Sequence, residues 1–334
     1  MLPDGRRLGA HLPLGGGMVA AVDRAQAIGL DTLQIFSDNP TAWRRRSEPP
    51  RELAAFRARI AELGLGPIAV HAPYLVNLAG PDEAFRLRSV EVLRHELSVA
   101  PTFGARFVNA HTGSHKGSGL ELGIERIAAG IAAALADLPD EPDPAVLVLE
   151  NSAGGGGGIG LDIGEILAVL QAIADHGVPP ERVAICLDTA HLWGAGHPID
   201  TAAGVDDLVA EFDERIGLER LVMIHLNDSK AELGSRMDRH EHLGAGAIGP
   251  DGLRRILTHP GLRHVTYYLE TPGMDEGYDA INAGRAHDLV AGRPLAVLPP
   301  EAMNLPGSRA RTGPSVEPAV ETTAVEATAG EPAG

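Results

Sequence analysis

Short apolar runs alternate with longer amphipathic segments along most of the chain. Short apolar runs bounded by turn residues are typical of buried strands, and apolar residues spaced three or four apart are typical of amphipathic helices. Strands are predicted at residues 8–10, 32–36, 67–70, 106–110, 145–149, 183–187, 221–224 and 265–269. Helices are predicted at residues 18–28, 52–63, 84–100, 123–138, 163–176, 204–216 and 252–258.

This repeated strand–helix alternation predicts an α/β fold, a single (β/α)8 TIM barrel formed by residues 1–298. The predicted strands end at fairly even intervals of about 25 to 45 residues, and a barrel of roughly 250 residues averages about 31 per unit before insertions. An open, doubly wound sheet is the alternative, but it rarely needs eight even repeats. Residues 299–334 are rich in Pro, Ala, Glu and Thr and lack aromatic residues, so we expect a disordered C-terminal tail.

The charge balance, the cysteine count and the length of the apolar stretches limit the classes of function that the chain can have. The 334 residues include 28 Lys and Arg against 45 Asp and Glu, a formal net charge of −17. This balance argues against a broad electrostatic nucleic-acid binder but not against a nuclease that carries positive charge as bound metal. With one cysteine, Cys186, no intrachain disulfide can form, and no apolar stretch is long enough to span a membrane. We therefore expect a cytoplasmic protein without membrane contact.

Ionisable residues gather where the predicted strands end. A His, Asp or Glu comes directly after seven of the eight runs, and in a barrel these side chains converge on the catalytic mouth. Six of these residues and three positions in the following segments make up the candidate metal ligands, which are His71, His111, Glu150, Asp188, His191, His225, Asp238, His240 and Glu270. Imidazole and carboxylate suit Zn, Mn or Fe(II), and nine such groups exceed the needs of one tetrahedral ion. They suit a cluster of about three ions that share a bridging carboxylate.

Each of these residues also has an ordinary structural interpretation. A single histidine after a strand is often a hydrogen-bonded rim residue, and Asp188 with His191 fits a local turn contact. Asp238 with His240 fits a solvated loop, and the two glutamates could pair with arginines. Their joint occurrence favours metal, because so many buried ionisable groups would be costly without metal or mutual pairing.

Seven motifs in this order resemble those of the endonuclease IV family of zinc-dependent abasic-site DNA repair enzymes, also called AP endonuclease family 2. The motifs read HAPYLVNLA at 71–79, NAHTGSH at 109–115, LENSAG at 149–154, CLDTAH at 186–191, HLNDSK at 225–230, GSRMDRHEHLGAGAIG at 234–249 and LETP at 269–272, and the resemblance as a whole runs from residue 9 to about residue 273. The resemblance implies three zinc ions, with Mn²⁺ as a substitute. It assigns His71, His111 and Glu150 to the first ion, and His191, Asp238 and His240 to the third. The second is assigned to Glu150, Asp188, His225 and Glu270.

The resemblance also implies the reaction. The family hydrolyses the phosphodiester 5′ to an abasic sugar in double-stranded DNA, leaving a 3′-hydroxyl and a 5′-deoxyribose phosphate, and it also removes 3′-blocking groups. Bound metal lowers the pKa of water and clamps the phosphate oxygens. Glu150, Glu270 and His111 are therefore the expected catalytic residues. We expect a monomer.

The resemblance implies that loops around the site recognise the abasic lesion. Tyr74 and Leu75 occupy positions whose side chains the family inserts into the duplex, and Arg44, Arg236 and Arg239 are the expected phosphate contacts. Asp38 and Thr41 depart from the family, because some members have a basic residue and an inserting arginine there. Two alternatives remain open. The first is a single-metal sugar isomerase or epimerase on the same barrel, which would not need the five further ligands. The second is a lesion-binding protein without turnover.

Overall fold

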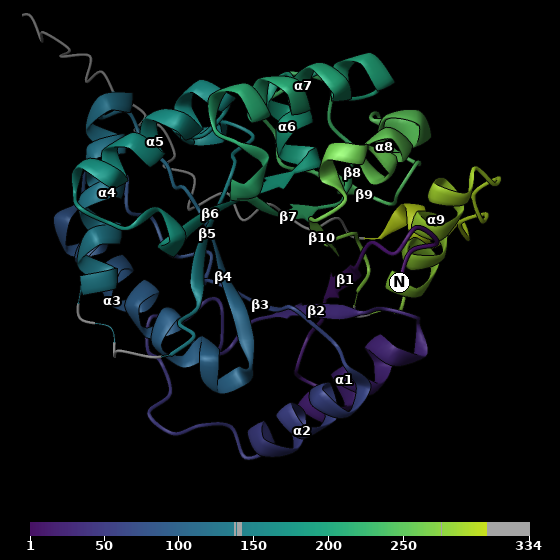
Figure 1. Cartoon of the computed structure of the whole chain (residues 1–334), viewed down its shortest axis with the longest axis horizontal. Coiled ribbons are helices and arrows are strands. Elements are labelled where there is room, and N and C mark those ends of the chain that lie inside the picture. Colours follow the sequence, from purple (N-terminus) through teal and green to yellow (C-terminus); the bar gives the residue numbers. More distant parts are fainter. Residues whose placement is uncertain (137, 139–141, 275, 306–334) are drawn as a thin grey trace, which may run out of the picture.

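Eight parallel strands close into a barrel, and helices enclose it (Figure 1). The computed structural model describes residues 1–136, 138, 142–274 and 276–305. The barrel strands are β1 (Leu8–His11), β2 (Thr32–Ile35), β3 (Ile68–His71), β4 (Ala105–His111), β5 (Val146–Glu150), β6 (Val183–Asp188), β7 (Leu221–His225) and β10 (Thr266–Leu269). The helices are α1 (Met18–Ala27), α2 (Leu53–Leu63), α3 (Glu83–Val99), α4 (Leu120–Ala136), α5 (Ile163–Asp175), α6 (Thr189–Ala195), α7 (Ala202–Arg215), α8 (Gly249–Thr258) and α9 (Asp279–Ala291).

The predicted TIM barrel is confirmed. Each of the eight apolar runs forms a barrel strand whose ends differ from the predicted ends by at most one residue. The strands pair in chain order, and β1 closes the barrel by pairing with β10. The runs were recognisable because strands of a barrel are covered on both faces and read as nearly continuous apolar segments.

Two apolar layers stabilise the fold. Inside the barrel lies a compact cluster that includes Phe107, Val148, Cys186 and Tyr268. A larger cluster fills the space between the strands and the surrounding helices. Gly9 allows β1 to approach β2 closely, because a Cβ at this position would lie 2.6 Å from the Thr32 Cγ2 atom. Cys186 is buried in the inner cluster, as expected for a core residue.

The structure adds elements that the sequence pattern did not predict. These are α6, α9 and a small antiparallel hairpin formed by β8 (Asp228–Ser229) and β9 (His240–Glu241). The first residues of the expected tail also differ from the prediction. Ala302 is fully buried, and its carbonyl oxygen lies 3.1 Å from His242 Nε2. Residues 306–334 lie outside the described residues.

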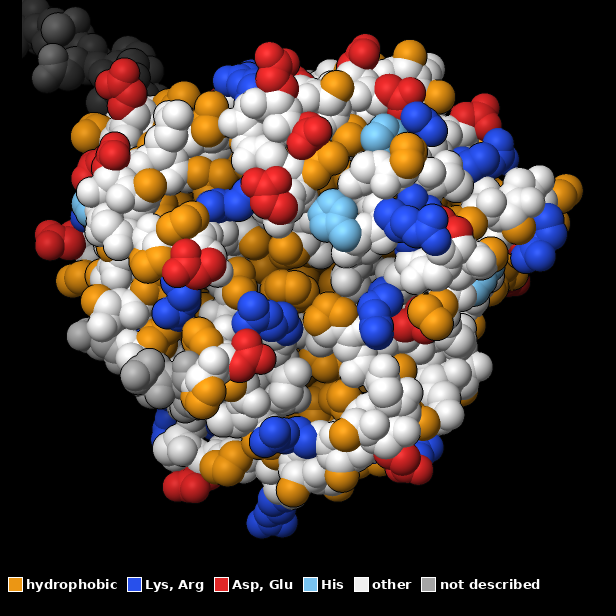
Figure 2. Space-filling model, in the orientation of Figure 1, with side chains coloured by type: hydrophobic (Ala, Val, Ile, Leu, Met, Phe, Trp, Pro, Cys, Tyr) orange, Lys and Arg blue, Asp and Glu red, His pale blue; other side chains and the backbone are white. Residues whose placement is uncertain are grey.

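The end of the barrel at which the strands begin faces the viewer in Figures 1 and 2. In Figure 1 the strands follow one another clockwise, and right-handed crossovers then place the viewer at their N-terminal ends. Figure 2 shows hydrophobic side chains at the centre of this face, with charges of both signs scattered around them. Among the described residues of this face, no continuous basic stripe appears. No helix in the described part of the chain is long and apolar enough to cross a bilayer.

Candidate metal centre

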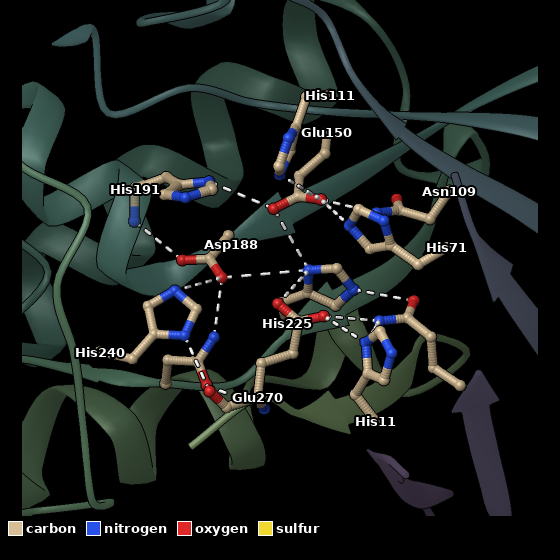
Figure 3. Close-up of polar contacts among 12 residues, drawn as sticks. His11, His71, Asn109, His111, Glu150, Asp188, His191, His225, His240 and Glu270 are labelled. Carbon is tan, nitrogen blue, oxygen red and sulfur yellow. Dashed lines mark hydrogen bonds and ion pairs between the residues drawn. The ribbon is translucent and has the colours of Figure 1, made fainter. Parts of the chain in front are cut away.

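The candidate ligands meet at the C-terminal end of the barrel (Figure 3). His71, His111, Glu150, Asp188 and His225 are the last residues of β3, β4, β5, β6 and β7, and Glu270 directly follows β10. His191 lies in α6, while His240 opens β9 and Asp238 precedes it. Parallel strands that end at one rim bring these residues together, which is why residues spread over most of the sequence share one site.

The first group joins three neighbouring strands. The Nε2 atoms of His71 and His111 each lie 3.6 Å from Glu150 Oε2. Ligand atoms of these three residues all lie within 4.8 Å of one another. His71 and Glu150 are buried, whereas the His111 side chain is 36% exposed. The group therefore opens on one side toward solvent.

The second group lies at the base of the site. It contains Glu150, Asp188, His225 and Glu270, whose ligand atoms again lie within 4.8 Å of one another. His225 Nδ1 is 3.2 Å from Glu150 Oε1 and 3.4 Å from Glu270 Oε2. Because Glu150 belongs to both groups, its two oxygens can bridge two ions.

The third group lies nearest the mouth. Asp188, His191 and His240 bring ligand atoms within 4.8 Å of one another. The Asp238 carboxylate lies 3.3 Å from His191 Nε2 and 3.1 Å from His240 Nε2. The Asp238 side chain is 49% exposed, so this carboxylate forms the outer wall of the site.

In four of the histidines, one ring nitrogen contacts an oxygen atom of the surrounding protein, and the other nitrogen faces the carboxylates of the site. Nδ1 lies 2.6 Å from the Ala72 carbonyl oxygen in His71, 3.0 Å from that of Asn151 in His191, and 2.8 Å from that of Glu270 in His240. His225 instead has Nε2 at 3.1 Å from the side-chain oxygen of Gln34. Such contacts fix the ring orientation and the tautomer of metal-ligating histidines.

Each carboxylate of the second group accepts a hydrogen bond from a buried amide. Asn109 Nδ2 donates to Glu150 (2.6 Å), Asn227 Nδ2 to Asp188 (2.7 Å) and Gln34 Nε2 to Glu270 (2.6 Å). Because an amide is neutral, its hydrogen bond orients the carboxylate but leaves the negative charge available to a cation. Gln34 and Asn109 were not among the sequence-predicted site residues. Strand alternation could have indicated Asn109, because it lies two residues before His111 on β4 and so on the same face.

His11, the last residue of β1, also lies beside this network. Its Nδ1 atom is 3.1 Å from Glu270 Oε1, and its ring packs 4.4 Å from that of Phe36. Burial lowers the pKa of His11. His11 is one of the seven ionisable residues that follow the predicted strands, but it is not among the nine candidate ligands.

Charge dominates the site in the absence of a cation. Burial alone would raise the pKa of Glu150, but the nearby His225 and His111 hold it well below its usual range. Burial would likewise lower the pKa of His240, yet Asp238 and Asp188 raise it to about 10. Without a bound ion, Glu150 is therefore ionised and His240 is protonated at neutral pH.

The ligand atoms fit bound metal ions. Glu150 Oε1, His225 Nδ1 and His240 Nε2 are buried and make no hydrogen bond, although each lies within ion-pair distance of another candidate ligand. Buried polar atoms without partners are rare and costly, and these three all point into the site. Imidazole nitrogens together with carboxylate oxygens are suitable donors for zinc and similar divalent ions.

The loop residues expected to contact DNA lie on the surface. Tyr74 follows β3 with 60% of its surface exposed, and its ring packs 5.2 Å from Phe36 and 6.3 Å from His111. Leu75 is half-buried, and Arg44 is exposed. Arg236 and Arg239 are exposed in the loop that carries Asp238. Their roles remain predictions.

Two arginines next to Arg44 already have protein partners. The Arg45 side chain is 8% exposed, lies 3.4 Å from the buried Glu96 and donates to the carbonyl oxygen of Asn39 (2.9 Å). Arg46 is 3.2 Å from Asp38, the residue that departs from the family. Arg45 therefore holds the loop after β2 in place, whereas Arg44 and Arg46 are both exposed to solvent.

Asp228 stabilises the loop that follows β9. It is fully buried and accepts backbone hydrogen bonds from Ser229 (2.8 Å), Gly246 (3.0 Å), Ile248 (2.9 Å) and Gly249 (3.2 Å). We expect Asp228→Ala to lower the free energy of unfolding by at least about 3 kcal/mol, because four backbone N–H groups, two of them buried and two half-buried, lose their acceptor. Urea unfolding measures this. Asp228→Asn keeps one carbonyl oxygen and should cost less; equal stability of the alanine variant and the wild type would refute this role.

Comparisons with known proteins show which family of proteins the chain resembles. The family model described as "Xylose isomerase-like TIM barrel" matches residues 22–290. The protein named probable endonuclease 4 from Methanoculleus marisnigri is 40% identical over 282 residues, which cover 84% of this chain and 98% of that protein. Its namesake from Halorhodospira halophila is 42% identical over 271 residues, covering 81% and 90%.

Solved structures agree with these relatives. The crystal structure of endonuclease IV from Thermus thermophilus superposes with a TM-score of 0.69 at 36% identity, covering 80% of this chain and 92% of that one. A D-tagatose 3-epimerase-like protein reaches a TM-score of 0.58 at 18% identity and shares the fold alone.

The fold and the site define a xylose isomerase-like TIM barrel with clusters of side chains able to hold metal ions. Within this class the chain belongs to the endonuclease IV family, and it is an enzyme of the phosphodiester hydrolase type.

Proposed function

We propose that this protein is a zinc-dependent apurinic/apyrimidinic endonuclease of base excision repair. It hydrolyses the phosphodiester 5′ to an abasic site in double-stranded DNA, leaves a 3′-hydroxyl and a 5′-deoxyribose phosphate, and also trims 3′-blocking groups. The observation that supports this most is the overlap of three ligand groups through Glu150 and Asp188. A single-metal sugar isomerase or epimerase would need only the second group, so His71, His111, His191 and His240 would have no role in it.

The residues at the mouth would hold about three ions. We assign His71, His111 and Glu150 to the first ion, and Glu150, Asp188, His225 and Glu270 to the second. His191, Asp238 and His240 hold the third, and Asp188 lies close enough to contribute as well. Zinc suits this mixture of imidazole and carboxylate, and Mn²⁺ would be a substitute. All nine ligands come from one chain, so a monomer can carry the complete site.

Bound divalent metal supplies a nucleophilic water at neutral pH and charge stabilisation for both the attacking and the leaving oxygen. The protein residues create the conditions for that chemistry. Glu150 and Glu270 stay ionised and are held by Asn109 and Gln34, so their oxygens are preset toward the cations. The partly exposed His111 and Asp238 border the opening through which a phosphate would enter.

Tyr74 is positioned to act as a wedge at the lesion. An aromatic ring exposed beside the ligands can occupy the space left by a missing base, and extrusion of a nucleotide is least costly where no base is stacked. We expect Tyr74→Ala to weaken binding to an abasic duplex by about 10-fold or more, equivalent to about 1–3 kcal/mol of lost stacking. Fluorescence anisotropy with labelled duplex measures this. Leu87→Ala, which removes an exposed apolar side chain from α3, is the matched control. Equal weakening in both variants would contradict the assignment.

The function is tested with two duplexes that differ at one position. One contains a single abasic analogue and the other is undamaged. We expect metal-dependent incision of the abasic strand alone. Binding without incision would favour a lesion-binding protein, while inertness toward DNA combined with turnover in a ketose and aldose screen would favour the sugar enzyme.

A further inference from the structure

Gln34 connects two of the ligands assigned to the second ion. It lies in β2 and is fully buried. Its Nε2 atom is 2.6 Å from Glu270 Oε1, and its Oε1 atom is 3.1 Å from His225 Nε2. In Figure 3, Glu270 and His225 lie side by side at the base of the site, with His11 next to them. One side chain therefore contacts one ligand after β10 and another at the end of β7.

The orientation of the Gln34 amide follows from its partners. The Glu270 carboxylate is ionised and can only accept hydrogen bonds, so the Gln34 atom that faces it must be the NH₂ group. The amide oxygen then faces His225 and can only accept. His225 must consequently carry a proton on Nε2, so Nδ1 is the nitrogen that would give its electron pair to a cation. That Nδ1 atom is buried without a hydrogen-bond partner and lies 3.4 Å from Glu270 Oε2.

His225 differs from the other oriented histidines in how it is held. His71, His191 and His240 each direct one ring nitrogen at a backbone carbonyl oxygen, which no substitution removes. His225 relies on a side chain from a strand that supplies none of the assigned ligands. The tautomer and the position of His225 therefore depend on the side chain of Gln34, which a substitution can remove.

We infer that Gln34 is a positioning residue for the second ion. It presents His225 Nδ1 and a Glu270 oxygen to the same cation by fixing the tautomer of one and the orientation of the other. The inference rests on the proposed function, since it takes these two residues as ligands. Gln34 itself is not one of the nine assigned ligands.

The test uses the full chain stripped of metal and titrated with Co²⁺, whose visible absorption reports on ligand geometry. Gln34→Met preserves length and volume but removes the contacts of the amide with Glu270, with His225 and with the neighbouring His11. We expect one of about three Co²⁺ equivalents to bind about 10–100-fold more weakly, the usual effect of losing such a contact, with a changed absorption spectrum. Gln171→Met, on the exposed side of α5, is the control and should match the wild type.

A second variant separates the proposed effect from the consequences of misfolding. Gln34→Asn keeps the amide, but its shorter side chain cannot reach both partners, so the same class of ion should weaken. The metal-free proteins are compared by thermal unfolding, which separates lost packing from lost ligand positioning. Variants with lowered thermal stability but with wild-type Co²⁺ affinity and spectrum would overturn the inference. If the wild type itself failed to bind Co²⁺ at these ligands, the proposed metal centre would be wrong, which is a different result.

Discussion

Glu150→Gln is expected to lower the rate of abasic-site cleavage by at least about 1,000-fold. Glu150 belongs to two ligand groups, and its side chain is completely buried. The amide of glutamine is neutral, so the variant loses the charge that faces two cations and one oxygen that can bridge them. A loss of about 4 kcal/mol in transition-state stabilisation corresponds to this factor. The measurement is single-turnover cleavage of a labelled abasic duplex, with metal content determined on the same sample.

The matched control is Glu121→Gln, an equivalent change at an exposed position in the first turn of α4. It should retain wild-type activity and metal content. If the Glu150 variant kept full activity with its metal in place, the hydrolytic assignment of this centre would be wrong. A variant that lost metal but cleaved normally would equally contradict the account.

Removal of metal is expected to abolish cleavage and to lower thermal stability. A ligand present at about 1,000 times its dissociation constant stabilises the native state by about 4 kcal/mol per site. At about 2–4 °C per kcal/mol, one such site corresponds to a Tm decrease of at least about 8 °C. Chelation followed by gel filtration and differential scanning calorimetry measures this, and cleavage should return on addition of Zn²⁺, with Mn²⁺ as a substitute.

The pH dependence of metal binding has a defined sign. Asp238 and Asp188 outweigh burial and raise the pKa of His240 to about 10, so the metal-free site holds protons at pH 7 that an incoming cation must displace. Metal affinity should therefore rise with pH, and binding should release protons into a weakly buffered solution. Undiminished cleavage after complete chelation, or metal affinity that falls as pH rises, would contradict the assigned ligands.

The barrel was predictable from the sequence because its strands are covered on both faces. Parallel strands in such a position leave continuous apolar runs, and their number and spacing define the closed topology. The helices α6 and α9 were not predicted, because neither has apolar residues at helical spacing along one face. Thr189, Ala190, His191, Leu192 and Trp193 of α6 are all buried. In α9 the buried face includes Asp279, Asn282 and Arg285, which read as exposed positions in a sequence.

The location of the site was predictable for the same geometric reason, because barrel strands end at a common rim. Its supporting contacts were harder to foresee. Gln34 lies within an apolar run and contacts residues about 190 and 236 positions away in the chain, so no local pattern connects them. Arg45 stands between two other arginines in the sequence, which by itself reads as a solvated run of charge. In the folded chain it turns inward to Glu96, a pairing that depends on how α3 packs beneath the loop after β2.

The most direct test of the central claim combines cleavage chemistry with metal counting on one sample. Purified protein is incubated with a duplex carrying one abasic analogue that lacks an aldehyde, and the product ends are resolved. The account predicts a single cut 5′ to the analogue with a 3′-hydroxyl end, and about three zinc ions per chain. Because the analogue cannot undergo β-elimination, that product requires hydrolysis. A fully metallated sample that leaves the duplex intact, or that cuts it elsewhere, would contradict the proposed function.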